Sequence, residues 1–264
     1  RITPRWFDVT TRWQMATSCL QLNPAFKVPD GISLDAWVTA MKRVTRSQEV
    51  VLFVDELEWR KLRGVELSFR TDFVKVGRSS YTTSSVLMLE TKPVIKVLTT
   101  IVAVNDSLEH SIPLPFADAI RKQIRHNAKH IAPSLEPLER CPRPANYFSW
   151  QTVARWVECD QLGHVNQSQY CLLMEEARAI AAASGGYGDC INRDVAAAPP
   201  AKFQLSYFGQ AHAGDRLSVL TWWDGQSFRC EILKNDESGA EVQLLTVGRF
   251  WVKSDTLIPN TSKL

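Results

Sequence analysis

The order of apolar and polar residues in the second half of the chain predicts an antiparallel sheet with one helix. A strand-like run at about 148–157 comes first, and apolar residues then recur at helical spacing over about 167–183. Three further strand-like runs follow at 202–223, 227–233 and 241–252. Ala213-Gly214-Asp215 predicts a turn inside the first of these runs, and Asp236-Glu237-Ser238-Gly239 predicts a hairpin.

The first half shows the same order of elements. A strand is expected at about 6–13 and a helix at about 33–47, with a turn at Pro29-Asp30-Gly31 and Ser33 as the N-cap. The strand-like runs that follow lie at 65–76, 80–90 and 94–104, and Lys92-Pro93 marks the turn between the last two. One helix followed by several strands, twice over, predicts two modules of similar architecture.

Three short matches between the halves keep their order and nearly the same spacing, which indicates a faint internal repeat. The matches pair Thr11-Arg12-Trp13 with Ala154-Arg155-Trp156, Ser79-Ser80-Tyr81 with Gln226-Ser227-Phe228, and Leu98-Thr99 with Leu245-Thr246. We therefore expect a first module over residues 1–104, a linker over 105–145 and a second module over 146–264.

Charge is distributed unevenly along the 264 residues. Residues 1–140 carry 20 Lys and Arg against 15 Asp and Glu, whereas residues 141–264 carry 11 against 13. The total of +3 is too small to indicate nucleic-acid binding. The expected linker contains a basic helical piece at 116–130, with Arg121, Lys122, Arg125 and Lys129. This piece either binds a phosphate such as that of coenzyme A or is an ordinary solvated helix face.

The six cysteines form no C-x-x-C pair and stand at no zinc-ligand spacing with histidine, so we expect no metal and no cofactor. Scattered single thiols are typical of a reducing compartment. Because the sequence begins with Arg1, we expect a processed form, in the mitochondrial matrix or a plastid after removal of a transit peptide. No apolar run reaches ~18 residues, so no transmembrane helix is expected.

The ten residues from Cys159 to Ser168 carry the candidate chemistry. Asp160 lies on the loop between the strand-like run at 148–157 and the helical stretch that begins near Tyr170. Unpaired backbone N–H groups and the positive end of the helix dipole lie at a helix N-terminus. A carboxylate at this place can attack a carbonyl, or activate water against it, while amides hold the carbonyl oxygen.

The spacing Asp160-x-x-Gly-His-Val-Asn, followed by Tyr170 and Glu175, resembles the signature of hotdog-fold acyl-CoA thioesterases of the 4-hydroxybenzoyl-CoA thioesterase-like group. The resemblance implies an α+β fold in which an antiparallel sheet wraps around a central helix. Together with the repeat, it implies a tandem (double) hotdog, in which one chain imitates the usual homodimer.

The resemblance also implies roles for individual residues. Asp160 is the catalytic carboxylate, as nucleophile or as general base for water, and the amides from Val165 to Gln167 are candidate oxyanion donors. The residues expected to line the substrate site are Gly163, His164, Val165, Asn166, Gln167, Tyr170 and Glu175. Among these, His164 is a tempting base, but in the resembling families this segment shapes the loop, and Asn166 is the expected N-cap.

Other residues of the second half receive mainly structural expectations. Tyr170 and Met174 are one helical turn apart and should pack inward, whereas Glu175 should orient the loop or a water and Glu176 should face solvent. Gly214-Asp215 should be a structural turn. The aromatic residues that either wall an acyl tunnel or fill the core are Trp222, Trp223 and Phe228.

The first half departs from the pattern, because Thr17 stands where the second half has Asp160 and no Gly-His-Val-Asn follows. Trp37 is the counterpart of Tyr170, about ten residues late. The first module is thus expected to be degenerate. The resemblance then implies one competent site per chain, shared between the Asp160 loop and the sheet of residues 65–104.

The leading interpretation is an enzyme that hydrolyses acyl-CoA or acyl-carrier thioesters without metal. The alternative is a non-catalytic hotdog protein, a pseudoenzyme scaffold subunit of a larger and possibly mitochondrial complex. A dehydratase of the same fold is disfavoured, because the histidine and acid pair that such enzymes use is missing. We expect no nucleic-acid partner, and the protein is either a homodimer or a subunit of such a complex.

Overall fold

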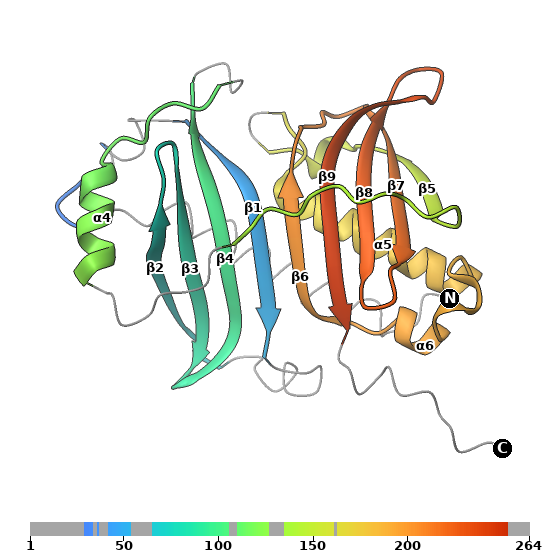
Figure 1. Ribbon diagram of the computed structural model, residues 1–264, viewed down its shortest axis with the longest axis horizontal. Coiled ribbons are helices and arrows are strands. Elements are labelled where there is room, and N and C mark those ends of the chain that lie inside the picture. Colours follow the sequence, from blue (N-terminus) through green and yellow to red (C-terminus); the bar gives the residue numbers. More distant parts are fainter. Residues whose placement is uncertain are drawn as a thin grey trace. The chain divides into compact units, whose positions relative to one another are not determined.

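A computed structural model describes residues 29–33, 36, 42–53, 65–105, 110–126, 135–160 and 163–252 (Figure 1). The chain divides into two compact units between Pro137 and Leu138. The first unit holds the described residues up to Pro137, and the second holds those from Leu138 onward. None of the helices in these ranges is both long and apolar enough to cross a membrane.

The first unit is a four-stranded antiparallel sheet with the order β2-β3-β4-β1. Its strands are β1 (Lys42–Leu52), β2 (Ser68–Val76), β3 (Ser80–Leu89) and β4 (Lys92–Val104). The helix α4 (Ala117–His126) packs against this sheet through Ile120 and Ile124, in a cluster with Phe73, Tyr81 and Ile101. Burying these side chains together removes apolar surface from water and fixes the helix on the sheet.

The basic residues of α4 lie on its opposite side. Lys122 and Arg125 are exposed, and Arg121 is half-buried and pairs with Asp118 one turn earlier. This is the arrangement of an ordinary solvated helix face, with an apolar stripe toward the sheet. Lys129 lies outside the described residues.

The strand-like runs of the first half are confirmed as β2, β3 and β4, but the helix expected over 33–47 is wrong from Lys42 onward. Residues Lys42–Leu52 form the strand β1, which pairs with β4 along its whole length. The segment contains the β-branched residues Val44, Thr45, Val50 and Val51, which favour a strand once a partner is available. The strand expected at 6–13 lies outside the described residues.

The second unit is a five-stranded antiparallel sheet with the order β6-β9-β8-β7-β5 and one long helix. The strands are β5 (Phe148–Val153), β6 (Pro200–Tyr207), β7 (Arg216–Trp223), β8 (Phe228–Asn235) and β9 (Glu241–Val252). The helix is α5 (Gln167–Ser184), and the short helices are η1 (Trp156–Glu158), η2 (Gly188–Cys190) and α6 (Arg193–Ala196).

The helix α5 lies across one face of this sheet (Figure 1). Met174 of α5 is fully buried, and its sulfur occupies the space that a Cβ atom at Gly248 of β9 would need. Because Gly248 has no side chain, the helix and the strand can approach closely. Phe203 and Phe250 stack beneath, and the helix ends at Gly185 with φ of 73°. A sheet wrapped around a central helix is the hotdog arrangement, so the expected α+β hotdog fold is confirmed.

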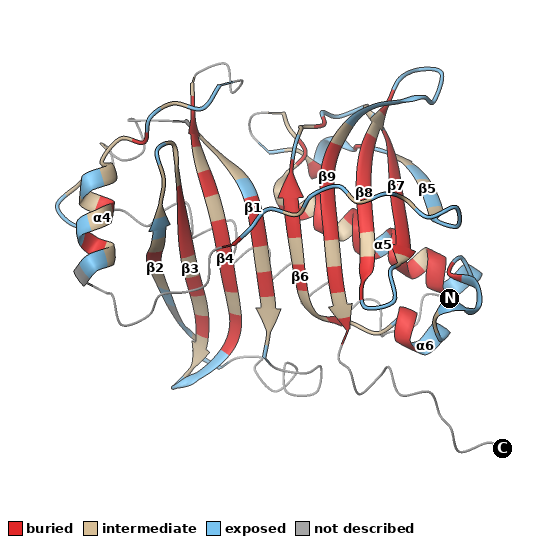
Figure 2. Ribbon diagram, in the orientation of Figure 1, coloured by how far each residue is buried: buried red, intermediate tan, exposed pale blue. Residues whose placement is uncertain are grey.

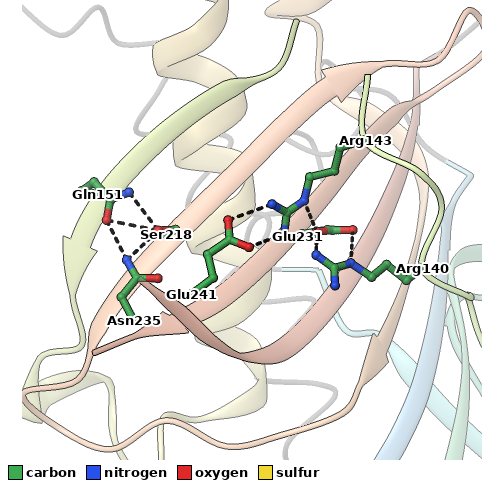
Figure 3. Close-up of polar contacts among 7 residues, drawn as sticks. All are labelled: Arg140, Arg143, Gln151, Ser218, Glu231, Asn235 and Glu241. Atoms are coloured by element: carbon green, nitrogen blue, oxygen red, sulfur yellow. Dashed lines mark hydrogen bonds and ion pairs between the residues drawn. The ribbon is translucent and has the colours of Figure 1, made fainter. Parts of the chain in front are cut away.

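The other face of the sheet is covered by the extended segment 138–147, which we call the strap (Figure 1). Figure 3 shows Arg140 and Arg143 of the strap on both sides of the Glu231 carboxylate of β8, whose side chain is fully buried. Arg143 also pairs with Glu241 of β9. Covered on both faces, β7 and β8 are buried along nearly their whole length (Figure 2).

The remaining expectations for the second half hold in outline. The strand expected at 148–157 ends at Val153, because the chain bends at Ala154 and enters η1. The run 202–223 is two strands, β6 and β7, and Gly214 with φ of 92° makes the expected turn before the second. The hairpin between β8 and β9 is also present, where Asp236 accepts hydrogen bonds from Ser238 and Ala240.

Candidate active site on the Asp160 loop

An ion pair between the exposed Arg155 side chain and the buried Glu158 carboxylate anchors the start of the Asp160 loop. Glu158 of η1 is 4% exposed, and its carboxylate accepts hydrogen bonds from the backbone N–H and the guanidinium of Arg155. The backbone carbonyl of Glu158 accepts a hydrogen bond of 2.8 Å from the amide of Asn166. The two ends of the loop, before Asp160 and after Val165, are therefore tied together.

Asp160 begins the turn of this loop, and it is exposed to solvent. Its backbone N–H donates to the carbonyl of His164 at 2.7 Å, and its carboxylate accepts from the His164 amide at 3.3 Å. The Gly163 amide donates to the Asp160 carbonyl, and Gly163 has φ of 78°, which a residue with a side chain adopts only under strain. The turn thus holds the carboxylate in a defined place while leaving it open to water.

Two histidines meet beside the loop. The imidazoles of His164 and His212 lie edge to face with their centres 4.8 Å apart, and their backbones form an isolated antiparallel bridge. His212 was not among the expected site residues, and its sequence signal is weak, since it stands alone in a polar turn.

Asp215 orients the second histidine. Its carboxylate accepts from the His212 amide at 2.8 Å and pairs with Lys234 at 2.8 Å. Burial raises the pKa of Asp215, but the hydrogen bonds from Lys234 and the His212 amide outweigh burial and hold the pKa below its usual value. Gly214-Asp215 is therefore a structural turn, as expected, and it also positions His212.

The oxyanion donors expected at Val165 and Asn166 are wrong. The Val165 amide donates to the carbonyl of Ala211 at 2.8 Å, and the Asn166 amide donates to the carbonyl of Glu158. These two N–H groups join the loop to neighbouring chain segments before the helix begins, so they are not unpaired helix-entry groups. Of the three expected amides, only that of Gln167 has no hydrogen-bond acceptor within the described residues.

The first turn of α5 is fixed by capping and by two tyrosines. Asn166 is the N-cap, as expected, and its side chain accepts from the Ser168 amide. The Tyr170 hydroxyl accepts from the Ala211 amide at 2.9 Å, and burial raises the pKa of Tyr170 to about 12. The Tyr207 hydroxyl donates to the carbonyl of Gln167. Tyr170 is 2% exposed and therefore packs inward, as expected.

Glu175 does not orient the Asp160 loop. Both of its carboxylate oxygens accept hydrogen bonds from Arg178, at 3.0 and 2.9 Å, and both side chains are buried. Arg178 also donates to the carbonyls of Ala196 and Ala198, so the pair fixes the segment around α6. Sequence reasoning missed Arg178, although a charged residue at the third position after Glu175 is a recognisable helix pair. Glu176, by contrast, is exposed as expected.

Of the aromatic residues of β7 and β8, Trp222 and Phe228 pack in the core of the second unit. Trp222 is 4% exposed and packs with Leu220 and Leu233 on the strap side of the sheet. Phe228 is fully buried on the α5 side, where its ring lies 5.0 Å from the Arg178 guanidinium carbon and 4.9 Å from the Trp223 ring. Within the described ranges, no group of three or more His, Cys, Asp or Glu residues is placed to hold a metal ion.

Comparison with known proteins places the chain by its fold. No protein-family model matches the sequence, and no curated protein sequence is detectably similar. An acyl-ACP thioesterase from Bacteroides thetaiotaomicron VPI-5482 matches over 92% of this chain and 88% of its own, with 15% identity and a TM-score of 0.55. A 12:0-ACP thioesterase from Umbellularia californica matches over 92% of this chain and 85% of its own, with 14% identity and a TM-score of 0.58. At these identities the likeness shows a shared hotdog fold.

Proposed function

We propose that this protein hydrolyses acyl thioesters, R–CO–S–R′, to a carboxylic acid and a thiol, with Asp160 as the catalytic carboxylate. The observation that carries the proposal is the exposed Asp160 carboxylate on a turn tied at both ends, directly before the central helix of a hotdog sheet. The proteins of similar fold described above are named as acyl-ACP thioesterases, which supports the same reaction class.

The carboxylate has a direct use in this reaction, because a thioester carbonyl is already electrophilic. As a general base, Asp160 takes a proton from water while the oxygen of that water bonds to the carbonyl carbon. The carbon–sulfur bond then breaks, and the departing thiolate receives the proton. As a nucleophile, Asp160 instead forms an acyl anhydride with release of the thiolate, and water then hydrolyses the anhydride.

The negative charge that develops on the carbonyl oxygen needs a donor nearby. In this proposal the Gln167 amide at the N-terminus of α5 is that donor, since the amides of Val165 and Asn166 already donate hydrogen bonds to backbone carbonyls. The positive end of the helix dipole adds to the stabilisation.

We further propose that the chain is a double hotdog with one competent site, of the 4-hydroxybenzoyl-CoA thioesterase-like type, acting on coenzyme A or carrier thioesters. Two compact units with antiparallel sheets, and fold matches over 92% of the chain, support the tandem arrangement. A reducing compartment, such as the mitochondrial matrix, is proposed because all five cysteines that the structure describes are free thiols.

The test is hydrolysis of a panel of acyl-CoA and acyl-carrier thioesters by the purified protein and by Asp160→Asn. Asparagine keeps the shape of the side chain but removes its basicity, so we expect a loss of roughly 10²-fold or more in kcat. Asp189→Asn, a change at another exposed aspartate of the same unit, is the matched control and should leave the rate unchanged. Equal rates for Asp160→Asn and the unmodified protein would refute the mechanism.

One observation favours the alternative of a non-catalytic scaffold subunit. The amides of Val165 and Asn166 are sealed by backbone hydrogen bonds, which leaves the Gln167 amide as a single candidate donor. If no thioester of the panel is hydrolysed and the protein copurifies with a large assembly that Asp160→Asn leaves intact, the scaffold function is supported instead.

A further inference from the structure

Among the strands that the structure describes, β5 ends the sheet of the second unit, where it pairs with β7. The outer edge of such a strand presents a row of N–H and C=O groups, and natural edge strands are usually protected by charges, proline or a bulge. The sequence of β5, Phe-Ser-Trp-Gln-Thr-Val, has no charge and no proline. It also pairs with β7 in one unbroken register, so within the described residues β5 is an edge without the usual protection.

Exposed apolar side chains are concentrated within β5 and directly beside it along the chain. Trp156 and Val157 of η1, which follow β5 directly, are 75% and 81% exposed. Tyr147, just before β5, is 41% exposed, and Val153 at its end is 49% exposed. These four are half of the eight large hydrophobic residues that are exposed in the described ranges, and they lie within eleven consecutive residues. Scattered apolar residues are normal on a surface, but a concentration at one edge marks an interaction site.

The side chains of β5 point alternately to the two faces of the sheet. Gln151 hydrogen-bonds to Ser218 and Asn235 on the face that the strap covers (Figure 3). Because successive side chains alternate, Tyr147, Ser149 and Val153 point to this face as well. Phe148 points to the other face, where it contacts the turn after α5 at Gly186.

We propose that this edge is the interface between two copies of the chain, whose β5 strands pair antiparallel about a two-fold axis through Trp150. In an antiparallel pair, two residues that lie opposite each other point to the same face of the sheet. Because side chains alternate along a strand, the numbers of two opposed β5 residues must then differ by zero, two, four or six, and an axis through Trp150 meets this condition. Tyr147 of one copy then lies opposite Val153 of the other, and Ser149 lies opposite Gln151. Apolar residues meet apolar ones and polar residues meet polar ones, which makes the edge self-complementary.

The surface available is sufficient for such a dimer. With about 200 Å² for a large apolar side chain, the exposed parts of the four residues amount to roughly 500 Å² per copy, or ~1,000 Å² for two. The half-buried side chains Phe148 and Trp150 and the edge backbone bring the total near the lower limit of ~1,200 Å² for specific interfaces. Since β5 carries no charge, pairing with its own copy opposes no like charges.

The test is sedimentation of the full chain, at concentrations from about 1 to 100 μM, for the unmodified protein and three variants. Val153→Lys puts a charge opposite Tyr147 of the second copy, and Trp156→Ser removes the largest exposed apolar group. Val242→Lys is the matched control, because Val242 is 57% exposed on β9, away from this edge. All three residues are exposed, so the variants should keep the circular dichroism and unfolding midpoint of the unmodified protein.

We expect a dimer whose dissociation constant rises about tenfold or more with Val153→Lys and with Trp156→Ser, and stays constant with Val242→Lys. Amides of residues 148–153 should also gain protection from hydrogen exchange as the protein concentration rises. A protein that is monomeric at 100 μM would overturn the proposal. So would a dimer that Val153→Lys leaves intact, or one that Val242→Lys weakens equally.

Discussion

Replacing Gly248 by alanine tests the contact on which the fold of the second unit depends. A Cβ atom at Gly248 would overlap the Met174 sulfur and would lie 3.1 Å from Leu205 Cδ2. Met174 is 0% exposed and Leu205 is 1% exposed, so either side chain can make room only by repacking within the core. Overpacking of this kind costs about 1–3 kcal/mol of unfolding free energy, and we expect Gly248→Ala to fall in that range.

The magnitude can be assigned to this contact by a double-mutant cycle with Met174→Ala. The single change Met174→Ala removes a buried side chain and should cost about 2–5 kcal/mol. In the double variant the new methyl group occupies part of the space that Met174 leaves. The loss of unfolding free energy in the double variant should therefore be smaller than the sum of the two single losses, by about 1 kcal/mol or more.

The assay is equilibrium unfolding in urea, with the slope m compared among the variants to verify that the transition stays two-state. Val242→Ala, at an exposed position of the same strand, should change the unfolding free energy by less than about 0.5 kcal/mol. If Gly248→Ala is as stable as the unmodified protein, or if the cycle shows no coupling, α5 does not pack on β9 as described.

Two further predictions concern charged groups of the second unit. Arg178→Met should lower the unfolding free energy, measured in urea, by about 3–5 kcal/mol, because it leaves the Glu175 carboxylate buried and unpaired. Adding Glu175→Gln should recover much of that loss. If the single variant is as stable as the unmodified protein, the ion pair does not have this role. Because the folded-state pKa of Asp215 lies below its unfolded value of ~3.9, its stabilisation is present above ~pH 4 and is lost as pH falls through the folded pKa. The difference in unfolding free energy between the unmodified protein and Asp215→Asn should therefore shrink as the pH falls below about 4. A difference that stays constant with pH would show that the contacts of Lys234 and the His212 amide do not depend on the charge of Asp215.

The sequence alone predicted most strands and the central helix of the second unit, because their signals are local. Alternation marks β8 and β9, Gly214 and the Asp236 hairpin mark the turns, and Asn166 marks the start of α5. Each of these signals acts within a few residues, through side-chain alternation, a glycine at positive φ or a side chain that caps a helix. The position of Asp160 on the loop before the helix was predictable for the same reason.

The tertiary structure decided what depends on partners far away in the chain. The segment from Lys42 is a strand and not a helix because β4, about fifty residues later, offers a complete row of backbone groups. The Val165 amide is occupied because the Ala211 carbonyl lies opposite, and the Arg178 guanidinium reaches the carbonyls of Ala196 and Ala198, about twenty residues later in the chain. Local sequence patterns contain no information on such pairings, since the energy of a hydrogen bond or a buried ion pair is set by whichever group the fold brings within reach.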